Sequence, residues 1–338
     1  MNSSSILDLT QASLDLEFYA CVVAANFGIL SNILNIIVSM REKIQEIHLM
    51  GLYYTFMSIF NILSIVCTLY LSVFSQTIGN APLYSTSIYA CLFIPYFTRV
   101  FNAMTPWLNV IISYDRIQAF NINYRKAFLY KKRNVKLMIL FFVVLACGVN
   151  AANLFFHLET QTQVNPITNQ TTTVHFCVAS NLVTLIRDVI PILTRIVLPL
   201  LTQTVLNIIL IKKMINYRKN VNLGLDDSRL RKERRFTFTV VVMNVVFVIG
   251  EIPFILGIIL INIYGYNPTT FISTTSSQSA IASFAYNVGV LSMMFVSYSL
   301  TFFVNFFTNK KYRLEVKKLL TFNLKDFKDY LTTQSSFK

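Results

Sequence analysis

The sequence predicts an all-α membrane protein, a seven-transmembrane helix bundle followed by a short amphipathic eighth helix. Three observations predict this fold class. Of the 338 residues, 54% are hydrophobic and only 13% are charged, and the mean hydropathy is +0.56. A soluble domain of this size cannot bury so much apolar surface. The apolar residues also fall into seven long runs, and the basic residues lie almost entirely between them.

Each of the seven runs is long enough to cross a membrane. A helix needs about 20 residues to cross a hydrocarbon core of roughly 30 Å, and a helix satisfies its own backbone hydrogen bonds there. We expect the spans at 17–40, 50–74, 88–118, 135–157, 182–211, 236–264 and 281–307.

The stretch from Lys310 to Leu320 is short, basic and amphipathic. Such a helix lies along a membrane surface, and we expect Tyr312, Val316 and Leu319 or Leu320 to face lipid. The chain then divides into an extracellular N-terminus at 1–16, a seven-span domain at 17–307, the amphipathic helix at 308–322 and a cytoplasmic tail at 323–338.

The positions of lysine and arginine predict the orientation, because cytoplasmic loops are enriched in these residues. Residues 41–47, 116–136, 212–235 and 310–338 hold two, seven, nine and eight of them, which is all but three of the 29 in the chain. The alternate segments, 1–16, 75–87, 158–181 and 265–280, hold none. We therefore expect a multi-pass protein of the plasma membrane, with the N-terminus outside and the C-terminus in the cytoplasm.

Two kinds of residue agree with this orientation. The sequons Asn2-Ser-Ser and Asn169-Gln-Thr, which are candidate N-glycosylation sites, both fall on the predicted outside. Cys91 and Cys177 are the two cysteines on the outer side, where disulfides are permitted. We expect them to pair and to tie the loop 158–181 to the outer end of the third helix.

Several short motifs occur in a fixed order between residue 17 and about residue 322. They are Gly28-Ile-Leu-Ser-Asn32, Asn61, Cys91, Asp115-Arg116-Ile117, Pro199, Phe247-Val-Ile-Gly-Glu251-Ile-Pro253, Thr301-Phe-Phe-Val-Asn305 and Asn309-Lys-Lys-Tyr-Arg313, with Cys91 and Arg116 25 positions apart. This order and spacing resembles the helix motifs of rhodopsin-like (class A) G-protein-coupled receptors. The chain is most similar in its divergence to invertebrate FMRFamide-type peptide receptors and nematode serpentine chemoreceptors. The resemblance implies a receptor that passes an extracellular ligand signal to a heterotrimeric G protein.

The chain also departs from the family pattern. Asn61, Thr105 and Thr301 stand where the family has an internal sodium site with an acid, so we do not expect an anionic cation site. The other departures are Glu251 in place of the aromatic toggle, Asn207 and Asn305 in place of tyrosines near the inner ends of helices five and seven, and Pro106 within the third helix. The activation relay is therefore expected to differ in detail.

Arg116 is the centre of the expected activation switch, to which Asn305 also belongs. A guanidinium at the membrane boundary is costly unless it is paired. Asp115 is adjacent, but neighbours on a helix point about 100° apart, so we expect imperfect pairing. Glu233 lies 20 positions before Pro253, where the resemblance places the acid of an inactive-state lock. A bridge from Arg116 to Glu233 would hold the third and sixth helices together until activation. The alternative is a solvated Asp-Arg pair, with Glu233 as one charge in a basic run.

Three arginines lie outside the basic loops, at 99, 187 and 195. Ionisable groups inside a membrane bundle often mark a ligand site or a pathway. Arg99, Arg195 and Glu251 form a candidate ligand pocket, together with Thr98 and Asn102 on the third helix. The alternative is that these charges pair only with each other.

The residues narrow the class of ligand. Thr98 occupies the position where amine receptors carry an aspartate, and residues 281–307 contain no lysine for a retinal Schiff base. A short neuropeptide with an amidated or acidic end, or a small chemosensory molecule, fits what remains. The competitor from another class is a transporter or channel with the charged cluster along its pathway, although such proteins are usually duplicated.

We find no catalytic motif, nucleotide-binding loop or metal-spaced cluster, and His48, His157 and His175 are scattered. We therefore expect no enzymatic activity, no cofactor, no metal and no nucleic-acid partner. The expected partners are the extracellular ligand, the G protein, arrestin at the Ser- and Thr-containing tail, and the lipid bilayer, whose anionic headgroups would contact the basic loops.

Replacement of Glu233 by alanine tests the expected lock. The change would remove the expected partner of Arg116 on the sixth helix. We therefore expect higher basal signalling. The measurement is G-protein activation, with and without agonist, at matched surface expression. Unchanged basal signalling and unchanged agonist potency would count against the lock.

Overall fold

The computed structural model describes residues 19, 22–23, 25–41, 49–68, 86–120, 128–164, 171–221, 236–250 and 298–320. Within them the chain is mostly helical. The helices are Ala25–Ser39, α3 (Met50–Ile65), α5 (Ile88–Ala119), α6 (Lys132–Val149), α7 (Asn181–Pro191), α8 (Leu198–Val221), Phe236–Gly250, a helix at 298–308, and α11 (Lys310–Leu320). Single turns of 3-10 helix occur at Phe128–Tyr130 and Ala151–Phe155, and a π-helical turn at Ile192–Val197 joins α7 to α8.

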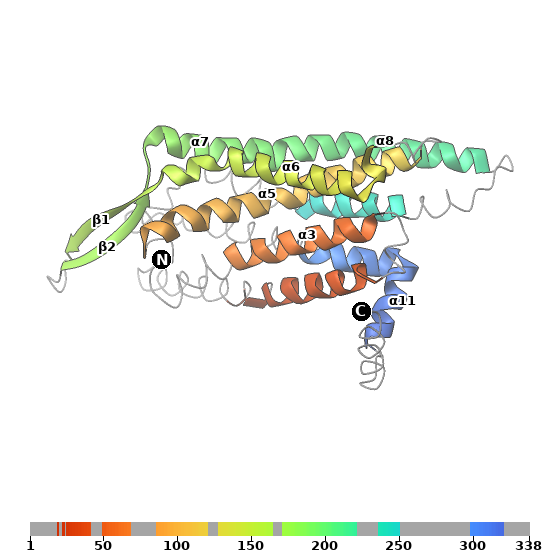
Figure 1. Ribbon diagram of the computed structural model, residues 1–338, viewed down its shortest axis with the longest axis horizontal. Helices are drawn as coiled ribbons and strands as arrows, with labels where there is room; N and C mark the ends of the chain where they lie inside the picture. Colours follow the sequence, from red (N-terminus) through yellow and green to blue (C-terminus); the bar gives the residue numbers. More distant parts are fainter. Residues whose placement is uncertain are drawn as a thin grey trace, which may run out of the picture.

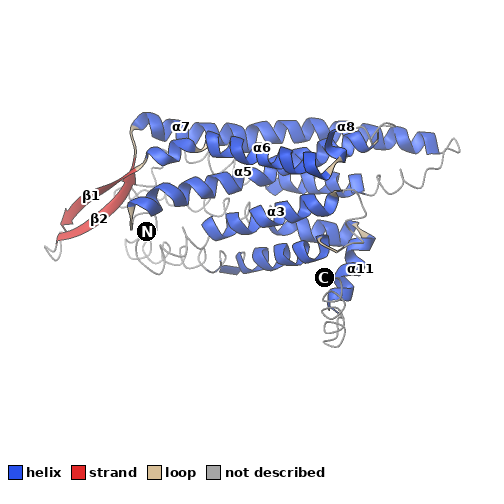
Figure 2. Ribbon diagram, in the orientation of Figure 1, coloured by secondary structure: helices blue, strands red, loops and turns tan. Residues whose placement is uncertain are grey.

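The long helices run along the length of the molecule, and α11 lies across one end (Figure 1). α5 is central, because α3, α6 and α8 all pack against it. A hairpin of β1 (His157–Val164) and β2 (Thr171–Val178) projects from the opposite end (Figure 2). We call these two ends the α11 end and the hairpin end.

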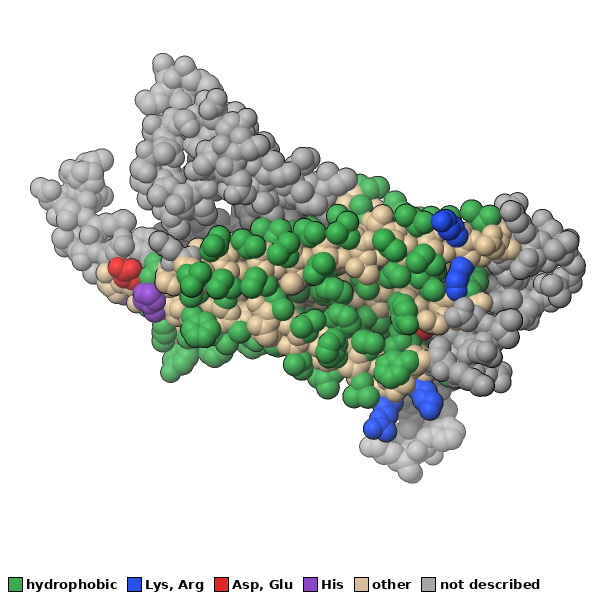
Figure 3. Space-filling view, turned by 90° about the horizontal axis from the view of Figure 1, so that it is seen from above, with side chains coloured by type: hydrophobic (Ala, Val, Ile, Leu, Met, Phe, Trp, Pro, Cys, Tyr) green, Lys and Arg blue, Asp and Glu red, His purple; other side chains and the backbone are tan. Residues whose placement is uncertain are grey.

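Three of the described helices are long and apolar enough to cross a membrane, namely Met50–Thr68, Lys132–Phe155 and Leu182–Asn216. Ala25–Ser39 and Phe236–Gly250 are apolar but shorter. Large hydrophobic side chains are exposed along these helices, for example Phe141 at 58% and Leu201 at 59%. Figure 3 shows hydrophobic side chains spread along the described part of the visible face, with basic residues near the α11 end. These helices indicate a membrane protein.

The hairpin corrects the expectation of an all-α chain. β1 and β2 pair antiparallel, from His157 opposite Val178 to Val164 opposite Thr171. The strands are rich in Thr and Val, and β-branched residues favour the pleated conformation over a helix. The segment between α6 and α7 therefore folds as a ribbon beyond the helices.

α11 coincides with the amphipathic stretch expected at 310–320, but its apolar face is turned inward. Tyr312 is 0% exposed and Val316 is 3% exposed, and both pack with Val38 and the partly buried Phe302 and Phe306. The expectation that Tyr312 and Val316 face lipid is therefore wrong. Amphipathicity predicted the helix, but it could not tell a lipid surface from a protein surface.

Polar contacts fix α11 to the first helix. The Tyr312 hydroxyl donates to Asn35 Oδ1 (2.7 Å), and burial raises the pKa of this hydroxyl. The Glu315 carboxylate accepts from Arg41 (2.9 Å) and Lys318 (3.0 Å). Burial opposes ionisation of Glu315, but these hydrogen bonds outweigh it and hold the pKa of the carboxyl below its usual value.

The lowered pKa of Glu315 predicts that acid weakens the attachment of α11. The contribution of the carboxylate is complete above its detached pKa of about 4.3 and is lost as the pH falls through the lower pKa of the attached state. A fluorophore at the exposed position 317 should report increased α11 mobility in this acidic range. In Glu315→Gln, α11 should be mobile already at neutral pH. In the control Glu159→Gln, in the hairpin, α11 should show the same pH response as in the wild type. A pH response unchanged in Glu315→Gln would contradict this explanation.

Candidate functional site

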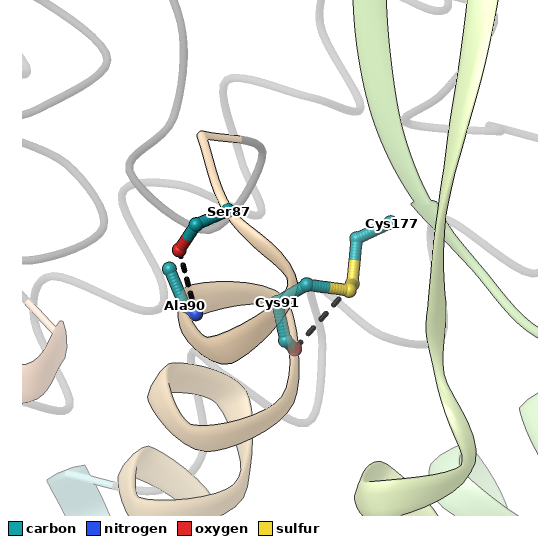
Figure 4. The surroundings of a disulfide bond; sticks show 4 residues. All are labelled: Ser87, Ala90, Cys91 and Cys177. Carbon is teal, nitrogen blue, oxygen red and sulfur yellow. Dashed lines mark hydrogen bonds between the residues drawn. A yellow bond between two sulfur atoms is a disulfide. The ribbon is translucent and has the colours of Figure 1, made fainter.

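A disulfide fixes the hairpin end of α5. Cys91 and Cys177, the predicted pair, are bonded, with their Cα atoms 5.6 Å apart. Figure 4 shows that the bond joins the first turn of α5 to β2. The Ser87 hydroxyl caps the same turn by accepting from the Ala90 N–H (3.2 Å). The start of α5 is thus fixed both by a cap and by a covalent bond.

Asp115 and Arg116 lie near the other end of α5 and form a buried ion pair. Arg116 Nη2 donates to Asp115 Oδ2, and both side chains are 0% exposed. This corrects the alternative of a solvated surface pair, and the adjacent residues bond directly in spite of their angular separation. Two buried charges are costly to desolvate, so the pair requires a supporting environment.

Tyr54 of α3 and Asn305 of helix 298–308 supply part of that environment. Both side chains are buried. The Tyr54 hydroxyl lies within electrostatic reach of Arg116 and beside the Asn305 side chain. Asn305 Nδ2 donates to the Thr301 carbonyl (2.8 Å). α3 thus brings the Tyr54 hydroxyl toward the guanidinium, and helix 298–308 brings the Asn305 side chain to that hydroxyl.

A second buried network occupies the middle of the molecule, and it is neutral. Asn61 Oδ1 accepts from the Thr105 hydroxyl (2.6 Å), and Asn61 Nδ2 donates to Asn32 Oδ1 (3.2 Å). Asn32 in turn donates to the carbonyls of Gly28 (2.7 Å) and Tyr298 (2.8 Å). The network therefore joins four helices, namely Ala25–Ser39, α3, α5 and helix 298–308.

The network extends toward the hairpin end through Asn102. Its Oδ1 accepts from the Tyr298 hydroxyl (2.7 Å) and from the Ser64 hydroxyl. The Thr301 hydroxyl donates to the sulfur of Met57 (3.5 Å). The donors and acceptors around Asn61 are thus amides, hydroxyls and carbonyls. Asn102, a candidate pocket residue, is only 7% exposed and serves this internal network.

Gly28 allows the first helix to approach its neighbours. A Cβ atom at this position would lie 2.7 Å from Ile65 Cδ1 and 3.4 Å from the Ser299 hydroxyl oxygen. The Ile65 methyl group could move aside, so the constraint is moderate. The close approach explains why Asn32, one turn later, reaches the carbonyl of Tyr298.

The three arginines outside the basic loops lie on α5, on α7 and in the π-helical turn. Arg99 donates to the Arg187 carbonyl, and the Arg187 guanidinium lies 4.9 Å from the ring centre of Phe156. Arg195 is half-buried in the π-helical turn, and Thr98 donates to the Ile94 carbonyl (2.7 Å). The structure therefore brings Arg99 to Arg187.

Two backbone irregularities meet between α5 and the α7–α8 helix. In a π-helical turn the Thr194 carbonyl would accept from residue 199, but Pro199 has no N–H. The indole N–H of Trp107 donates to this carbonyl instead (3.0 Å). In the reverse direction, Gln203 Nε2 donates to the carbonyl of Pro106 (3.0 Å). Each irregular backbone is thus bonded by a side chain of the other helix.

Some predicted residues lie outside the described part of the chain, namely Asn2, Asn169, Glu233, Glu251 and Pro253. The bridge from Arg116 to Glu233 and the pairing of Glu251 therefore remain predictions. Pro199 and Phe247 are buried, as residues of the helix interior.

Sequence reasoning missed Tyr54, Tyr298 and Asn244 as members of the buried polar contacts. Asn244 had a signal, because an amide within an apolar helix needs a partner in the bundle. Tyr54 and Tyr298 had none, because tyrosines also occur in membrane interfaces and cores.

Comparisons with known proteins add no family. No protein-family model matches the chain, and no curated protein matches it significantly.

Asn61→Ala should destabilise the protein by about 1–2 kcal/mol, because it strands the buried Thr105 hydroxyl and Asn32 Oδ1. Thermal unfolding of the purified full-length chain in nanodiscs measures the effect. The matched control is Asn26→Ala in the first helix, where an exposed amide donates to the Val22 carbonyl one turn back. Equal unfolding temperatures for the two variants would show that the central network contributes no measurable stability.

Proposed function

We propose that this chain is a seven-span receptor of the rhodopsin-like type, which activates a heterotrimeric G protein when an extracellular ligand binds. The observation that carries the proposal is the buried Asp115-Arg116 pair at the far end of the helix that begins at the Cys91–Cys177 disulfide. The motif order in the sequence supports the same assignment.

The distribution of charge supports the orientation in this proposal. Lys131, Lys132 and Arg133 at the start of α6, and Lys310 and Lys311 at the start of α11, are exposed. The hairpin contains no lysine or arginine between residues 157 and 178. In the proposed orientation the hairpin end is extracellular and the α11 end faces the cytoplasm, in accordance with the distribution of basic residues in loops.

The proposed mechanism follows from the buried guanidinium. In the described arrangement Arg116 is 0% exposed, so no cytoplasmic protein can contact it. Helix Phe236–Gly250 packs on the same core through Val240 and Met243. In this mechanism, movement of the helix away from α5 uncovers Arg116 at the base of a pocket. A G protein would insert there and stabilise the moved state, as population shift requires.

The ligand that best fits the outer half is a short peptide with an amidated or acidic end. Arg99, Arg187 and Arg195 lie on elements near the hairpin end, and carboxylates bind guanidinium groups well. A small-molecule cue would use the same arginines. A parallel screen of peptides and small molecules distinguishes these two classes of ligand.

The deciding experiment measures G-protein activation and ligand affinity in membranes that contain the full-length chain. The proposal expects a ligand whose affinity falls when a guanine nucleotide is added. A ligand-gated current or transport without any G protein would overturn it and favour a channel or transporter.

Arg116→Gln should abolish ligand-stimulated G-protein activation while ligand binding is retained. The single change leaves the buried Asp115 carboxylate unpaired, which costs about 3–5 kcal/mol of stability. The double variant Asp115→Asn/Arg116→Gln removes both charges, so it serves if the single variant does not fold. The charge-matched control is Lys136→Gln, an exposed residue of α6. Full activation by the double variant at equal surface expression would contradict a coupling role for Arg116.

A further inference from the structure

The side chain of Asn244 lies where three helices meet. It belongs to helix Phe236–Gly250 and is 0% exposed. Its Nδ2 group donates to the Ser113 hydroxyl of α5 (2.7 Å) and to Asn207 Oδ1 of α8 (2.8 Å). Ser113 is also 0% exposed and Asn207 is 9% exposed. Both protons of one buried amide are therefore committed to two other helices.

We infer that Asn244 is a positioning residue that clamps helix Phe236–Gly250 to α5 and α8, and that release of this clamp permits the helix to move. The clamp consists of Asn244, Ser113 and Asn207. Its role in signalling rests on the proposed function, whereas the clamp itself is a property of the helix packing.

α5 and α8 are bonded to each other independently of Asn244. Gln203 donates to the Pro106 carbonyl (3.0 Å) on the hairpin side of the clamp, and Lys213 donates to the Ile117 carbonyl (3.0 Å) on the α11 side. These two contacts hold α5 and α8 together as one unit. Asn244 attaches helix Phe236–Gly250 to that unit.

Helix Phe236–Gly250 has a second polar contact nearer the α11 end, where the Thr239 and Thr308 hydroxyls are 2.9 Å apart. This contact leads to helix 298–308 and not to α5 or α8. When the clamp is released, this contact would keep the helix next to helix 298–308.

The clamp leaves a buried acceptor of Asn244 unsatisfied, which lowers the cost of leaving this arrangement. Asn244 Oδ1 is buried and accepts no hydrogen bond, and neither does Asn109 Oδ1, one turn before Ser113. A displaced helix could offer Asn244 Oδ1 a donor in exchange for the two bonds that it loses. Two hydrogen bonds between membrane helices together shift an equilibrium by roughly tenfold, which a ligand can overcome.

The clamp is separate from the expected lock between Arg116 and Glu233. Ser113, Asn207 and Asn244 are uncharged, so salt and pH near neutrality should not weaken their contacts. A chain that used only the clamp would show basal activity sensitive to Asn244 and insensitive to Glu233.

The test measures the position of the helix in the full-length chain, in nanodiscs and without ligand or G protein. Spin labels are placed at the exposed Phe238 and at the exposed Leu137 of α6, with Cys21, Cys67 and Cys147 replaced by alanine. Asn244→Leu and Ser113→Ala should each increase the population at a second, longer distance, by about tenfold for Asn244→Leu. Ser113→Ala is the smaller change and serves if the leucine variant does not fold.

Thr204→Val is the matched control, because this exposed hydroxyl of α8 donates to the Leu200 carbonyl of its own helix (2.8 Å). It should give the wild-type distance distribution. The double variant Ser113→Ala/Asn244→Leu should resemble Asn244→Leu alone, since both changes remove the same bond. Wild-type distances in both single variants, or fully additive shifts, would overturn the clamp.

A parallel assay of basal G-protein activation separates the two proposals. The clamp and the receptor function together predict that Asn244→Leu raises basal activation, while Thr204→Val does not. Altered distances in a chain that activates no G protein would support the clamp and refute the receptor function. G-protein activation by the wild type, with unchanged distances in both variants, would support the receptor function and refute the clamp.

Discussion

The arrangement of the helices depends on the need of buried polar groups for partners where no water is available. Asn32, Asn61 and Asn244 are each no more than 1% exposed, and each bonds to a residue of another helix. A rotation or slide of one helix would strand both members of such a bond, and an unsatisfied buried group costs about 1–3 kcal/mol. Hydrophobic packing alone is less specific, because a core tolerates other apolar arrangements of similar total volume. The amides therefore specify one relative setting of the helices.

The kinds of polar group differ along the length of α5. Its middle contributes Asn102 and Thr105 to neutral contacts, while Asp115 and Arg116 near its end form an ion pair. A buried amide that loses its partner is destabilised by less than a buried guanidinium that loses its carboxylate. Adjustment is thus expected first among the amides. The ion pair can remain intact while its surroundings change, so in the proposed receptor the G protein would detect exposure of the pair rather than its breakage.

The sequence was sufficient for some features and not for others, for a physical reason. Long apolar runs predicted where α3, α5, α6 and the α7–α8 helix lie, and the side of the membrane predicted which cysteines would meet. Contacts such as those of Asn244 and Tyr54 depend on the rotation of each helix about its axis. A run that is apolar on all sides carries little information about that rotation. The π-helical turn was also unexpected, although Pro199 removes a backbone donor just after it. The inward face of α11 depended on Val38 and Phe302, which are distant in sequence.

The irregular backbones of α5 and of the α7–α8 helix explain why these two helices act as a fixed reference. Pro106 and the π-helical turn would each weaken an isolated helix. Here the Trp107 indole donates to the Thr194 carbonyl and Gln203 donates to the Pro106 carbonyl, so the two helices are attached beside both positions. Helix Phe236–Gly250 is joined to α5 and α8 through a side chain, that of Asn244, which donates to Ser113 and to Asn207. A side-chain contact can be exchanged without disturbing either backbone. The mobile element is therefore expected to be this helix, with α5 and α8 as the support against which it moves.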